Sequence, residues 1–539
     1  MTRKLLLGVL DLETDPFKHG RVPEPFAAGF LCADHYIDFI GDDCVTALQQ
    51  HVSELPDNYV IFAHNGGHFD FHYLFDAMDN PITIINGRIV KARWCERHWL
   101  QDSFSIMPVG LAKFGGKLDI DYQKLERSTR QRHMREIRRY LEQDCRVLYD
   151  AVERFNASFG SQLTVGSTAI KQLQKAHWFA QLPFRLDKVF RPYYFGGRVE
   201  CIRHGDIRGD YVVLDRNSMY PSVMIEADHP VNGEFDQLDY LPVGEGTVYF
   251  ADIDATSRGA LPVRAPDGTI SFPHGRGIFR AVSHEIETAL DLGLLDVHRV
   301  QWCAAAQETT RFANFVEHFY TLRMQFAEAG DRHGVEFCKF MLNSAYGKFG
   351  TNIENFKDWL IVRPGETTDD VLKAQGWGID SDQDEPMPYS SCPQFDLYCR
   401  PAKGAEGRHF DVTIAASITS AARASLLRAL HRADDPLYCD TDSIICRSAD
   451  LPQGKGLGQW KVEANGTRIC IAGKKLYAVQ NGPDWIKVRS KGGNLTGPQI
   501  AALTHGKSFK YENPAPTFSL AKGPGFVKRR FTATFDSNA

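Results

Sequence analysis

Two aspartates, Asp440 and Asp442, lie two residues apart in the segment YCDTDS at 438–443, between apolar flanks. In a strand or a tight hairpin, side chains two residues apart point to the same side of the backbone, so both carboxylates face one space. Two such acids with no basic neighbour in the segment repel each other unless a divalent cation lies between them. Because most pairs of this kind are solvated turn or cap residues, the segment alone is a weak indication of a metal site.

A second set of acids is spread over three segments of the N-terminal third, and a tyrosine accompanies it. Its members are Asp11, Glu13, Asp70, Tyr140 and Asp144. The first two share a face of a strand predicted from the apolar run at 5–10, and the last two share a face of a helix predicted around 128–157. Carboxylates from separate segments suit two-metal phosphodiester hydrolysis, in which two cations about 4 Å apart activate water and stabilise the leaving oxygen. The tyrosine hydroxyl is then expected to orient the water. A strand-end turn and a helix-surface pair are the simpler interpretations of the separate pieces.

Three histidines, His64, His68 and His72, also fall at intervals of four residues. On a helix this spacing places side chains on one face, where they can bind zinc. Gly66 and Gly67 disfavour a helix over this segment. We therefore do not expect zinc here.

A further acid, Asp215, follows the apolar run YVVL at 211–214 and opens the segment DRNSMYP at 215–221. We predict a strand that ends at this aspartate and a turn at Tyr220 and Pro221. The residue types in this segment do not by themselves specify a function.

Two helices are predicted over 311–350, with a break near Gly330. In the second helix, Lys339, Asn343 and Tyr346 are spaced to lie on one face. A cation, an amide and an aromatic ring on one stripe suit a nucleoside triphosphate, with the lysine on the phosphates and the tyrosine on the base or sugar. A surface lysine beside a core tyrosine is the structural alternative.

The chain has 539 residues, 43% of them hydrophobic, which predicts a globular protein of two to four domains. Its formal net charge is −5, but the segment from Gln453 to the C-terminus contains fourteen Lys/Arg against four Asp/Glu. This segment carries +10, so the rest of the chain carries −15. A basic tail and a carboxylate-rich body suit a protein that binds a polyanion and acts on it through metal ions. A solvated basic surface is the simpler explanation of the tail.

No stretch of the sequence approaches the length of a membrane span. The apolar run at 5–10 lacks a small-residue cleavage site and leads directly into acids, so we expect a buried strand rather than a signal peptide. The twelve cysteines are scattered without a CxxC pair, which argues against disulfides and zinc. We expect a cytoplasmic protein with reduced thiols.

The segments DLE at 11–13, HNGGHFD at 64–70 and YLEQD at 140–144 resemble the three motifs of the 3′–5′ proofreading exonuclease in family B DNA polymerases. The resemblance implies an exonuclease site with a water-orienting tyrosine, Tyr140, and a further basic residue, Lys117. The implied metal ligands are Asp11, Glu13, Asp70 and Asp144. The residues implied to hold a frayed primer end are Thr14, His64, Asn65, Phe69, Ser103 and Phe104.

Polymerase motifs follow in the order of the same family. The segments that resemble motifs A, B and C and the KxY motif lie at 215–221, 339–350, 438–443 and 473–477. By this resemblance Asp215 and Asp442 bind the two catalytic metals, with Asp440 close by, and the carbonyl of Arg216 adds a ligand. Lys475 and Tyr477 are expected on one strand face, where they steady the primer end.

The same resemblance implies a nucleotide site next to these acids. Its residues are Arg216, Ser218, Tyr220, Arg323, Lys339, Asn343 and Tyr346. Among them, Tyr220 is implied to lie under the incoming sugar and to exclude a 2′-hydroxyl, so that deoxynucleotides are selected.

RPYYFGGR at 191–198 resembles the YxGG linker of the protein-primed branch of the family, in which Tyr194, Gly196 and Gly197 would contact DNA. Packing between domains explains these residues equally well. Together with 11–26 and 342–349, this segment is similar to the polymerases of tectiviruses, which are tailless phages with linear genomes.

The resemblance covers essentially the whole chain and implies an RNase H-like α/β exonuclease domain followed by an α+β right-hand polymerase. The implied parts are an exonuclease domain at 1–188, a linker at 189–200, a palm at 201–264 and 411–505, fingers at 313–350, a thumb at 506–539, and palm insertions at 265–312 and 351–410. The first insertion would contact a terminal protein, and the second would support strand displacement and processivity. From its Gly, Pro and Asp content, however, the second insertion is predicted to be a loop.

The implied activity is that of a DNA-directed DNA polymerase with a proofreading exonuclease, which uses two Mg²⁺ per active site, replaceable by Mn²⁺. Expected partners are template and primer DNA, dNTPs, a terminal protein that supplies the priming hydroxyl, and a single-stranded DNA-binding protein. We expect no membrane association, a monomer or a heterodimer with the terminal protein, and, for a viral protein, the host cytoplasm.

Other functions stay open. One is a DNA-primed family B polymerase, and another is a two-metal exonuclease whose C-terminal part only binds DNA. A catalytically inactive replication scaffold predicts lost carboxylates, and none is missing from the motifs.

Overall fold

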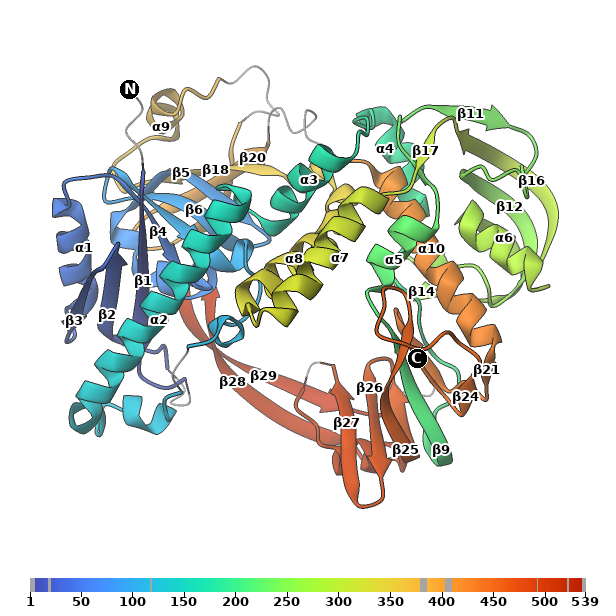
Figure 1. Ribbon diagram of the computed structural model, residues 1–539. Coiled ribbons are helices and arrows are strands. Elements are labelled where there is room, and N and C mark those ends of the chain that lie inside the picture. Colours follow the sequence, from blue (N-terminus) through green and yellow to red (C-terminus); the bar gives the residue numbers. More distant parts are fainter. Residues whose placement is uncertain are drawn as a thin grey trace.

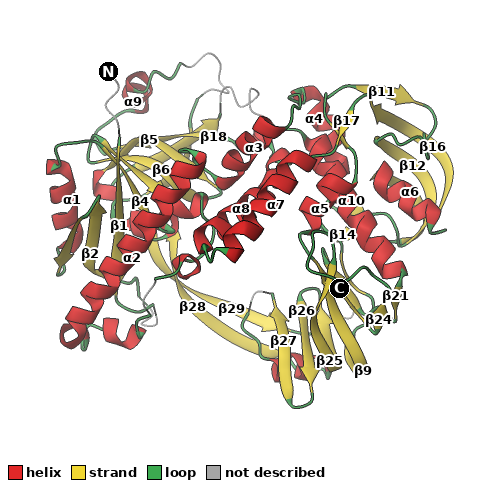
Figure 2. Ribbon diagram, viewed as in Figure 1, coloured by secondary structure: helices red, strands yellow, loops and turns green. Residues whose placement is uncertain are grey.

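The computed structural model describes residues 5–17, 21–116, 119–378, 385–402, 410–491, 493–520 and 523–535. Its strands form a ten-stranded, a seven-stranded and a four-stranded sheet, together with smaller two-stranded pairs. The ten-stranded sheet lies on one side of the molecule and the other two sheets lie on the opposite side, with long helices between them (Figure 1, Figure 2).

The N-terminal region is built on the ten-stranded sheet. Its own elements are β1 (Leu6–Thr14), β2 (Pro25–Cys32), β3 (His35–Ile40), α1 (Cys44–Glu54), β4 (Tyr59–Ala63), β5 (Met78–Ile85), β6 (Arg88–Trp94), β7 (His98–Asp102), α2 (Arg130–Phe159) and α3 (Val165–Ala176). Residues 6–10 of the apolar run begin β1, which pairs parallel to β4 and antiparallel to β2. The helix predicted around 128–157 is α2, which packs against β1 and ends at Gly160, where φ is 77°. Both predictions are confirmed.

The segment 351–410 is not the loop that its composition predicts. It contains β18 (Lys357–Val362), α9 (Thr368–Ala374), β19 (Met387–Ser391) and β20 (Asp396–Pro401). These strands extend the N-terminal sheet in the order β19-β20-β18-β5. Trp359 pairs with Ile82, and its indole N–H donates to the carbonyl of Ile84 at 3.1 Å. The loop prediction is wrong because an apolar strand in this segment pairs with a strand that is remote in sequence, while glycines such as Gly365 only turn the chain between elements.

The seven-stranded sheet carries the other motifs, and its order is β27-β26-β25-β9-β23-β22-β8. The elements of this region are α4 (Phe184–Phe190), β8 (Val199–Cys201), β9 (Gly205–Arg216), α5 (Met219–Glu226), α10 (Val412–His431), β22 (Tyr438–Asp440), β23 (Ser443–Cys446), β25 (Trp460–Gly473), β26 (Leu476–Asn481) and β27 (Asp484–Ser490). The strand predicted before Asp215 is β9, at the centre of the sheet. Leu214 and Ile444 join the core under the helices, whereas Val213 and Ile445 belong to a cluster on the other face. This alternation places successive side chains on opposite faces.

A four-stranded sheet in the order β11-β16-β12-β15 forms a separate lobe. Its elements are β11 (Phe235–Leu238), β12 (Tyr249–Arg258), β15 (His274–Val282), α6 (Ser283–Asp291) and β16 (Leu295–Ala306). The small pairs are β10 (His229–Pro230) with β17 (Thr309–Thr310), β13 (Val263–Arg264) with β14 (Ile270–Ser271), and β21 (Ala433–Asp434) with β24 (Ser448–Ala449). Because β12 pairs with both β15 and β16, the boundary predicted at 264 divides one sheet.

Two helices lie where the sequence predicts them, α7 (Ala313–Glu328) and α8 (Arg332–Phe349). Gly330 breaks the pair with a φ of 72°, which a residue with a side chain rarely adopts. Phe337 of α8 packs edge-to-face on Phe155 of α2, with ring centroids 5.2 Å apart. The helix pair is thereby anchored to the N-terminal region, as Figure 1 shows.

The C-terminal part contains α11 (Gly497–Thr504) and a hairpin of β28 (Phe509–Ser519) and β29 (Gly523–Ala533). The hairpin reaches from the seven-stranded sheet towards the N-terminal region (Figure 1). Leu520, which follows β28, is buried in the hydrophobic cluster that also contains Phe71 and Phe75. The described part of the C-terminal region therefore touches both halves of the molecule.

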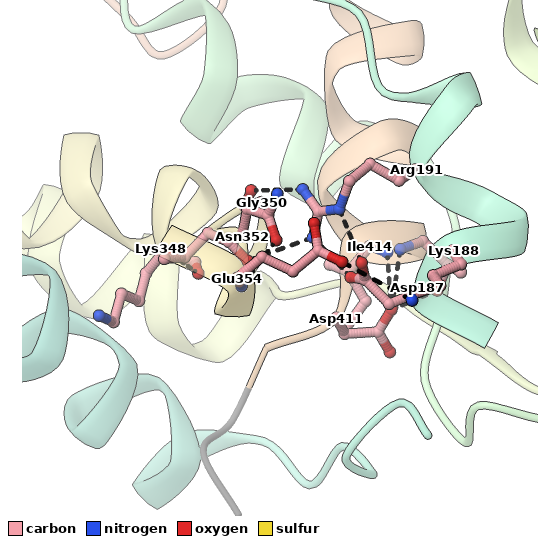
Figure 3. Close-up of polar contacts among 11 residues, drawn as sticks. Asp187, Lys188, Arg191, Lys348, Gly350, Asn352, Glu354, Asp411 and Ile414 are labelled. Atoms are coloured by element: carbon pink, nitrogen blue, oxygen red, sulfur yellow. Dashed lines mark hydrogen bonds and ion pairs between the residues drawn. The ribbon is translucent and has the colours of Figure 1, made fainter. Parts of the chain in front are cut away.

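The connection between the two halves is held by Arg191, directly after α4. Its guanidinium donates to both carboxylate oxygens of Asp187, at 2.7 and 2.5 Å. It also donates to the carbonyls of Gly350 and Thr351, at 3.2 Å each, which follow α8. Asp411, before α10, lies beside this cluster (Figure 3). The linker, the end of α8 and the start of α10 meet at this point.

Among the described residues, no helix is both long and apolar enough to cross a membrane. The twelve cysteines are all free thiols.

Candidate active sites

The acids Asp215, on β9, and Asp442, in the turn between β22 and β23, lie close together at the seven-stranded sheet. β22 and β23 form the hairpin predicted for YCDTDS, and Thr441 in its turn has a φ of 57°. Ser443 pairs with Asp215, and the N–H of Arg216 donates to the carbonyl of Asp442 at 2.7 Å. The sheet register therefore brings together two acids that are far apart in sequence.

Lysines face these acids from the neighbouring strands. Lys461 lies 3.0 Å from Asp215, and Lys475 donates to both carboxylate oxygens of Asp440 at 2.7 Å. A further acid, Glu463, pairs with Lys487 and lies 3.7 Å from Lys461. None of the ion pairs between described residues involves Asp442. The chain therefore supplies its own cations to three of the four acids.

Burial and mutual repulsion act on the remaining acid. They raise the pKa of Asp442 to about 6, with burial as the main cause, followed by the charges of Asp215, Asp440 and Glu463. Burial also raises the pKa of Asp215, although the hydrogen bond from Lys461 opposes this effect. Burial and a neighbouring carboxylate disfavour the ionised form of such an acid. An added cation would stabilise that ionised form.

These acids fit Mg²⁺ in its usual binding mode. Among the described residues, no group of three or more His, Cys, Asp or Glu side chains is placed to hold a metal ion. Mg²⁺ typically takes one or two carboxylates and completes its shell with water and substrate phosphates. Asp215 and Asp442, with the carbonyl of Arg216, offer such an incomplete set of hard oxygen ligands.

A cavity of about 660 Å³ lies between these acids and the helix pair α7/α8. It is lined by all seven of the predicted nucleotide-binding residues, namely Arg216, Ser218, Tyr220, Arg323, Lys339, Asn343 and Tyr346, together with Asp215 and Asp442. The rings of Tyr220 and Tyr346 stack with centroids 4.0 Å apart and an interplanar angle of 17°. The helical stripe of lysine, amide and aromatic ring therefore faces the acid pair.

Two basic residues of this cavity, Lys455 and Lys461, were not predicted from the sequence. Lys461 and Glu463 alternate on β25, which pairs with β9. That alternation of charges after a strand-like tryptophan is the sequence signal that would have found Lys461. Assigning the strand to β9, however, requires long-range pairing that no local pattern shows.

Arg216 lines the cavity with the other predicted nucleotide-binding residues, but its side chain takes a different direction from that of Asp215. Its guanidinium donates to both carboxylate oxygens of Glu226 at 2.7 Å and to the carbonyl of Gly458 at 2.8 Å. The side chain is buried, and it ties the end of β9 to α5. The reason for the difference is that successive residues of β9 point to opposite faces, so Arg216 points away from Asp215.

A second cavity, of about 370 Å³, lies on the other side of the acids and is lined by Asp440, Lys475, Tyr477, Lys487 and Arg489 among others. Lys475 is not on a strand face with Tyr477 as predicted. It lies in the turn before β26 with a φ of 60°, because the pairing of β25 with β26 shifts register there. Its N–H donates to the hydroxyl of Tyr438 at 3.0 Å.

The YxGG segment packs directly behind the acid hairpin. The N–H of Thr441 donates to the carbonyl of Arg198 at 2.8 Å. A Cβ atom on Gly197 would lie 2.7 Å from the hydroxyl of Thr441, so this position needs glycine. Arg423 of α10 donates to the carbonyls of Phe195 and Gly196, at 2.8 and 2.9 Å.

Tyr194, in the same segment, packs against the end of α8. A Cβ atom on Gly350 would lie 2.6 Å from the Tyr194 ring. The packing interpretation of this segment therefore has direct structural support, whereas the predicted DNA contacts of Tyr194, Gly196 and Gly197 stay predictions.

The acids of the N-terminal region also come together. The N–H of Leu12 donates to a carboxylate oxygen of Asp70 at 3.2 Å, which places Asp70 beside the strand that carries Asp11 and Glu13. Burial raises the pKa of Asp70 to about 7.

The nearby acids also affect the pKa values of two side chains on α2. Burial, and then the charges of Asp144, Glu13 and Asp11, raise the pKa of Tyr140. The pKa of Cys145 is raised by burial and by all four acids. Four carboxylates and the tyrosine hydroxyl thus share one region between β1 and α2.

Several residues predicted to hold a primer end lie next to this region. His64 contacts the Ser103 hydroxyl at 2.9 Å, and its ring lies 5.7 Å from that of Phe104. Phe69 packs against Phe17. Asn65 has a left-handed backbone.

Two further predictions concern Thr14 and Lys117. Thr14 is buried, with its hydroxyl on the carbonyl of Asp15. Lys117 lies outside the described residues.

Known proteins match the chain over its length. Residues 117–442 match the protein family described as "DNA polymerase type B, organellar and viral". The DNA-directed DNA polymerase of Enterobacteria phage PRD1 is 38% identical, and the match covers 98% of each chain. A probable DNA polymerase of Agaricus bitorquis is 22% identical over 84% of this chain and 68% of its own length.

Solved structures share the fold. Phi29 DNA polymerase complexed with primer-template DNA superposes with a TM-score of 0.73 at 20% identity, covering 98% of this chain and 100% of that chain. Its orthorhombic crystal form gives a TM-score of 0.74 at 18% identity with the same coverage. The predicted fold, an exonuclease domain followed by a right-hand polymerase, is confirmed. The chain belongs to the type B DNA polymerases of the organellar and viral class.

Proposed function

We propose that this chain extends primer ends with dNTPs under the direction of a DNA template and removes mispaired ends by 3′–5′ hydrolysis. The observation that carries the proposal is the cavity in which Asp215 on β9 and Asp442 in the β22–β23 turn face Lys339, Asn343 and Tyr346 of α8. Acids on one wall and a cation with an aromatic ring on the other suit the two ends of a metal-bound nucleoside triphosphate. The membership in the type B family supports the same activity.

Asp215, Asp442 and the carbonyl of Arg216 would hold two Mg²⁺ or Mn²⁺ ions, with Asp440 as a supporting acid kept in place by Lys475. When bound there, such ions lower the pKa of the primer hydroxyl and neutralise the charge of the departing pyrophosphate.

The proposal gives the other residues that line the cavity the following roles. Arg323 and Lys339 donate to the phosphates, Tyr346 packs on the nucleoside, and Tyr220, stacked on Tyr346, occupies the place where a 2′-hydroxyl would have to fit. Ser218 and Asn343 offer polar groups on the same walls.

In the N-terminal region, Asp11, Glu13, Asp70 and Asp144 would hold the metal ions of an exonuclease site. The Tyr140 hydroxyl, whose raised pKa keeps it protonated, is placed to orient a water molecule. His64, Ser103 and Phe104 form a cluster that suits an unpaired primer end, because aromatic rings stack on bases.

We further propose that the first primer is a hydroxyl of a terminal protein, with which the chain forms a heterodimer. The 38% identity to the polymerase of phage PRD1 over nearly the full length, and the YxGG segment, support this assignment. The four-stranded lobe is proposed to contact the terminal protein, and the strands of 351–410 to assist strand displacement. A single-stranded DNA-binding protein is a further proposed partner.

Primer extension on a DNA template with dNTPs and Mg²⁺ tests the polymerase proposal. We expect Asp442→Ala to lower extension by at least about a hundredfold, since metal ions supply several kcal/mol of transition-state stabilisation, and to leave 3′–5′ degradation intact. Asp70→Ala should do the reverse. Asp484 is an exposed acid at the tip of the β26–β27 hairpin, so Asp484→Ala should change neither activity.

If the unmodified protein degrades DNA but does not extend primers, the polymerase proposal is wrong and the nuclease alternative is supported. An initiation assay with a candidate terminal protein and a labelled dNTP then tests protein priming. A labelled, covalently extended terminal protein supports it, whereas extension of DNA primers only would favour the DNA-primed alternative.

A further inference from the structure

Lys461 lies next to Asp215, one of the two acids proposed to hold the metal ions. On β25 it is the direct cross-strand partner of Asp215 on β9. Its ammonium nitrogen lies 3.0 Å from one carboxylate oxygen of Asp215 and 3.7 Å from Glu463. The lysine side chain is 46% exposed, so it can leave this contact without breaking the core.

The other lysines of the site contact different acids. Lys475 pairs with Asp440, and Lys487 pairs with Glu463. Among the described residues, Lys461 is the one basic side chain that forms an ion pair with either of the two acids proposed to hold the metal ions. Its ammonium group therefore occupies the space next to Asp215 that a bound metal ion would need.

An ammonium group and a divalent ion a few ångströms apart repel each other, so binding of the ion to Asp215 must displace Lys461. A second acceptor is within reach of the displaced side chain. Lys461 also lines the cavity that holds Arg323, Lys339 and Lys455, the basic residues that suit a triphosphate. The lysine thus borders both the acids and the place of the phosphates.

We propose that Lys461 is an exchangeable counter-ion of the polymerase site. Without nucleotide it pairs with Asp215 and competes with divalent metal ions; when a metal-bound nucleotide enters, it moves to the phosphates. This proposal rests on the proposed function and adds a consequence to it: the lysine weakens metal binding to the empty site and strengthens binding of the metal together with the nucleotide.

The experiment measures Mn²⁺ binding to the full-length protein without DNA or nucleotide, by calorimetry and by electron paramagnetic resonance. Asp215→Asn identifies which binding step belongs to this site. We expect Lys461→Met, which keeps the length of the side chain, to bind Mn²⁺ about fivefold more tightly at this site, the ratio that corresponds to about 1 kcal/mol for a half-exposed ion pair.

Two variants serve as controls. Lys461→Arg keeps the charge and should stay within about twofold of the unmodified protein, as should Lys487→Met, which removes an equal charge from a lysine that does not touch Asp215. In primer extension, Lys461→Met should raise the KM for dNTP about fivefold. Circular dichroism verifies the fold of each variant, and Lys461→Gln replaces Lys461→Met if the latter does not fold.

Mn²⁺ affinity of Lys461→Met equal to or weaker than that of the unmodified protein would overturn the counter-ion role, and so would an equal tightening by Lys487→Met. If the unmodified protein extends primers while Lys461→Met binds Mn²⁺ unchanged, only the role of Lys461 is wrong. If the unmodified protein neither extends primers nor shows an Asp215-dependent Mn²⁺ site, the proposed function itself is wrong.

Discussion

The two acid sites of this molecule balance their negative charge in different ways. In the N-terminal site, Asp70 is 1% exposed and accepts a backbone N–H from Leu12, and burial raises its pKa to about 7. In the site on the seven-stranded sheet, Asp215 and Asp440 are 20% and 19% exposed and pair with Lys461 and Lys475. Burial therefore dominates at Asp70, whereas ion pairs across the sheet hold Asp215 and Asp440.

The two sites also differ in the elements that hold the acid-bearing segments in place. Tyr140 and Asp144 sit on α2, which packs against β1 of the same domain. The hairpin with Asp442, by contrast, is held from behind by the linker and by Arg423 of α10. We infer that damage to the linker or to α10 affects synthesis more than degradation, and the following variants test this contrast.

Arg423→Met should have the largest effect. The Arg423 and Glu285 side chains are 2% and 1% exposed and form a buried ion pair with contacts of 2.8 and 2.6 Å. Removing the arginine leaves a buried charge unpaired, which typically costs about 3–5 kcal/mol. Denaturant unfolding should show this loss, and extension should fail at a lower temperature than degradation. The double variant with Glu285→Gln should recover part of the stability. Equal loss of both activities would break the contrast between the sites.

Gly197→Ala should have an intermediate effect. The added Cβ atom would lie 2.7 Å from the Thr441 hydroxyl and 2.9 Å from its methyl group, so the hairpin must shift. A shift of this kind should lower primer extension about tenfold, or about 1.4 kcal/mol in activation free energy, with degradation unchanged. Gly196→Ala is the matched control, since its Cβ atom would meet nothing within 4 Å. If both variants extended primers at the unmodified rate, the linker would not position the hairpin.

Asp411→Asn tests whether burial and backbone N–H donors also control the charge of a carboxylate that lies away from both acid sites. Asp411 accepts the N–H groups of Thr413 and Ile414, and burial raises its pKa from 3.8 to about 6. Because the folded state favours the protonated acid, this group lowers the free energy of unfolding as pH rises from about 4 to about 6.

The asparagine keeps the acceptor oxygen but cannot ionise. Asp411→Asn should therefore gain at least about 1 kcal/mol relative to the unmodified protein between pH 4 and pH 7, measured by chemical denaturation at several pH values. A difference that does not change with pH would show that the charge of Asp411 is balanced in another way.

Local patterns predicted much of both sites. Asp215 follows the apolar run YVVL on β9, Tyr140 and Asp144 share a helical face, and Lys339 and Tyr346 share another. These relations depend on backbone geometry over a few residues, so the sequence shows them directly. The family resemblance supplied the order of the parts.

Contacts between distant segments were not predictable in this way. The pairing of Lys461 with Asp215, the direction of the Arg216 side chain, and the pairing of Trp359 with Ile82 all depend on which strands become neighbours. Strand pairing at long sequence separation leaves no periodic signal, and composition misidentified the strands of 351–410 as a loop.

The sheet extension by β18 has a consequence for how the protein is made. The Trp359 indole and its acceptor, the carbonyl of Ile84, are 275 residues apart, so the N-terminal sheet is assembled from two separate stretches of the chain. During synthesis, β5 leaves the ribosome long before β18 has been translated. Until then the edge of β5 is unpaired, and an unpaired strand edge is prone to pairing with other strands. A fragment that stops before residue 357 would keep that open edge permanently. The N-terminal sheet therefore cannot be completed until the chain has been translated past β18.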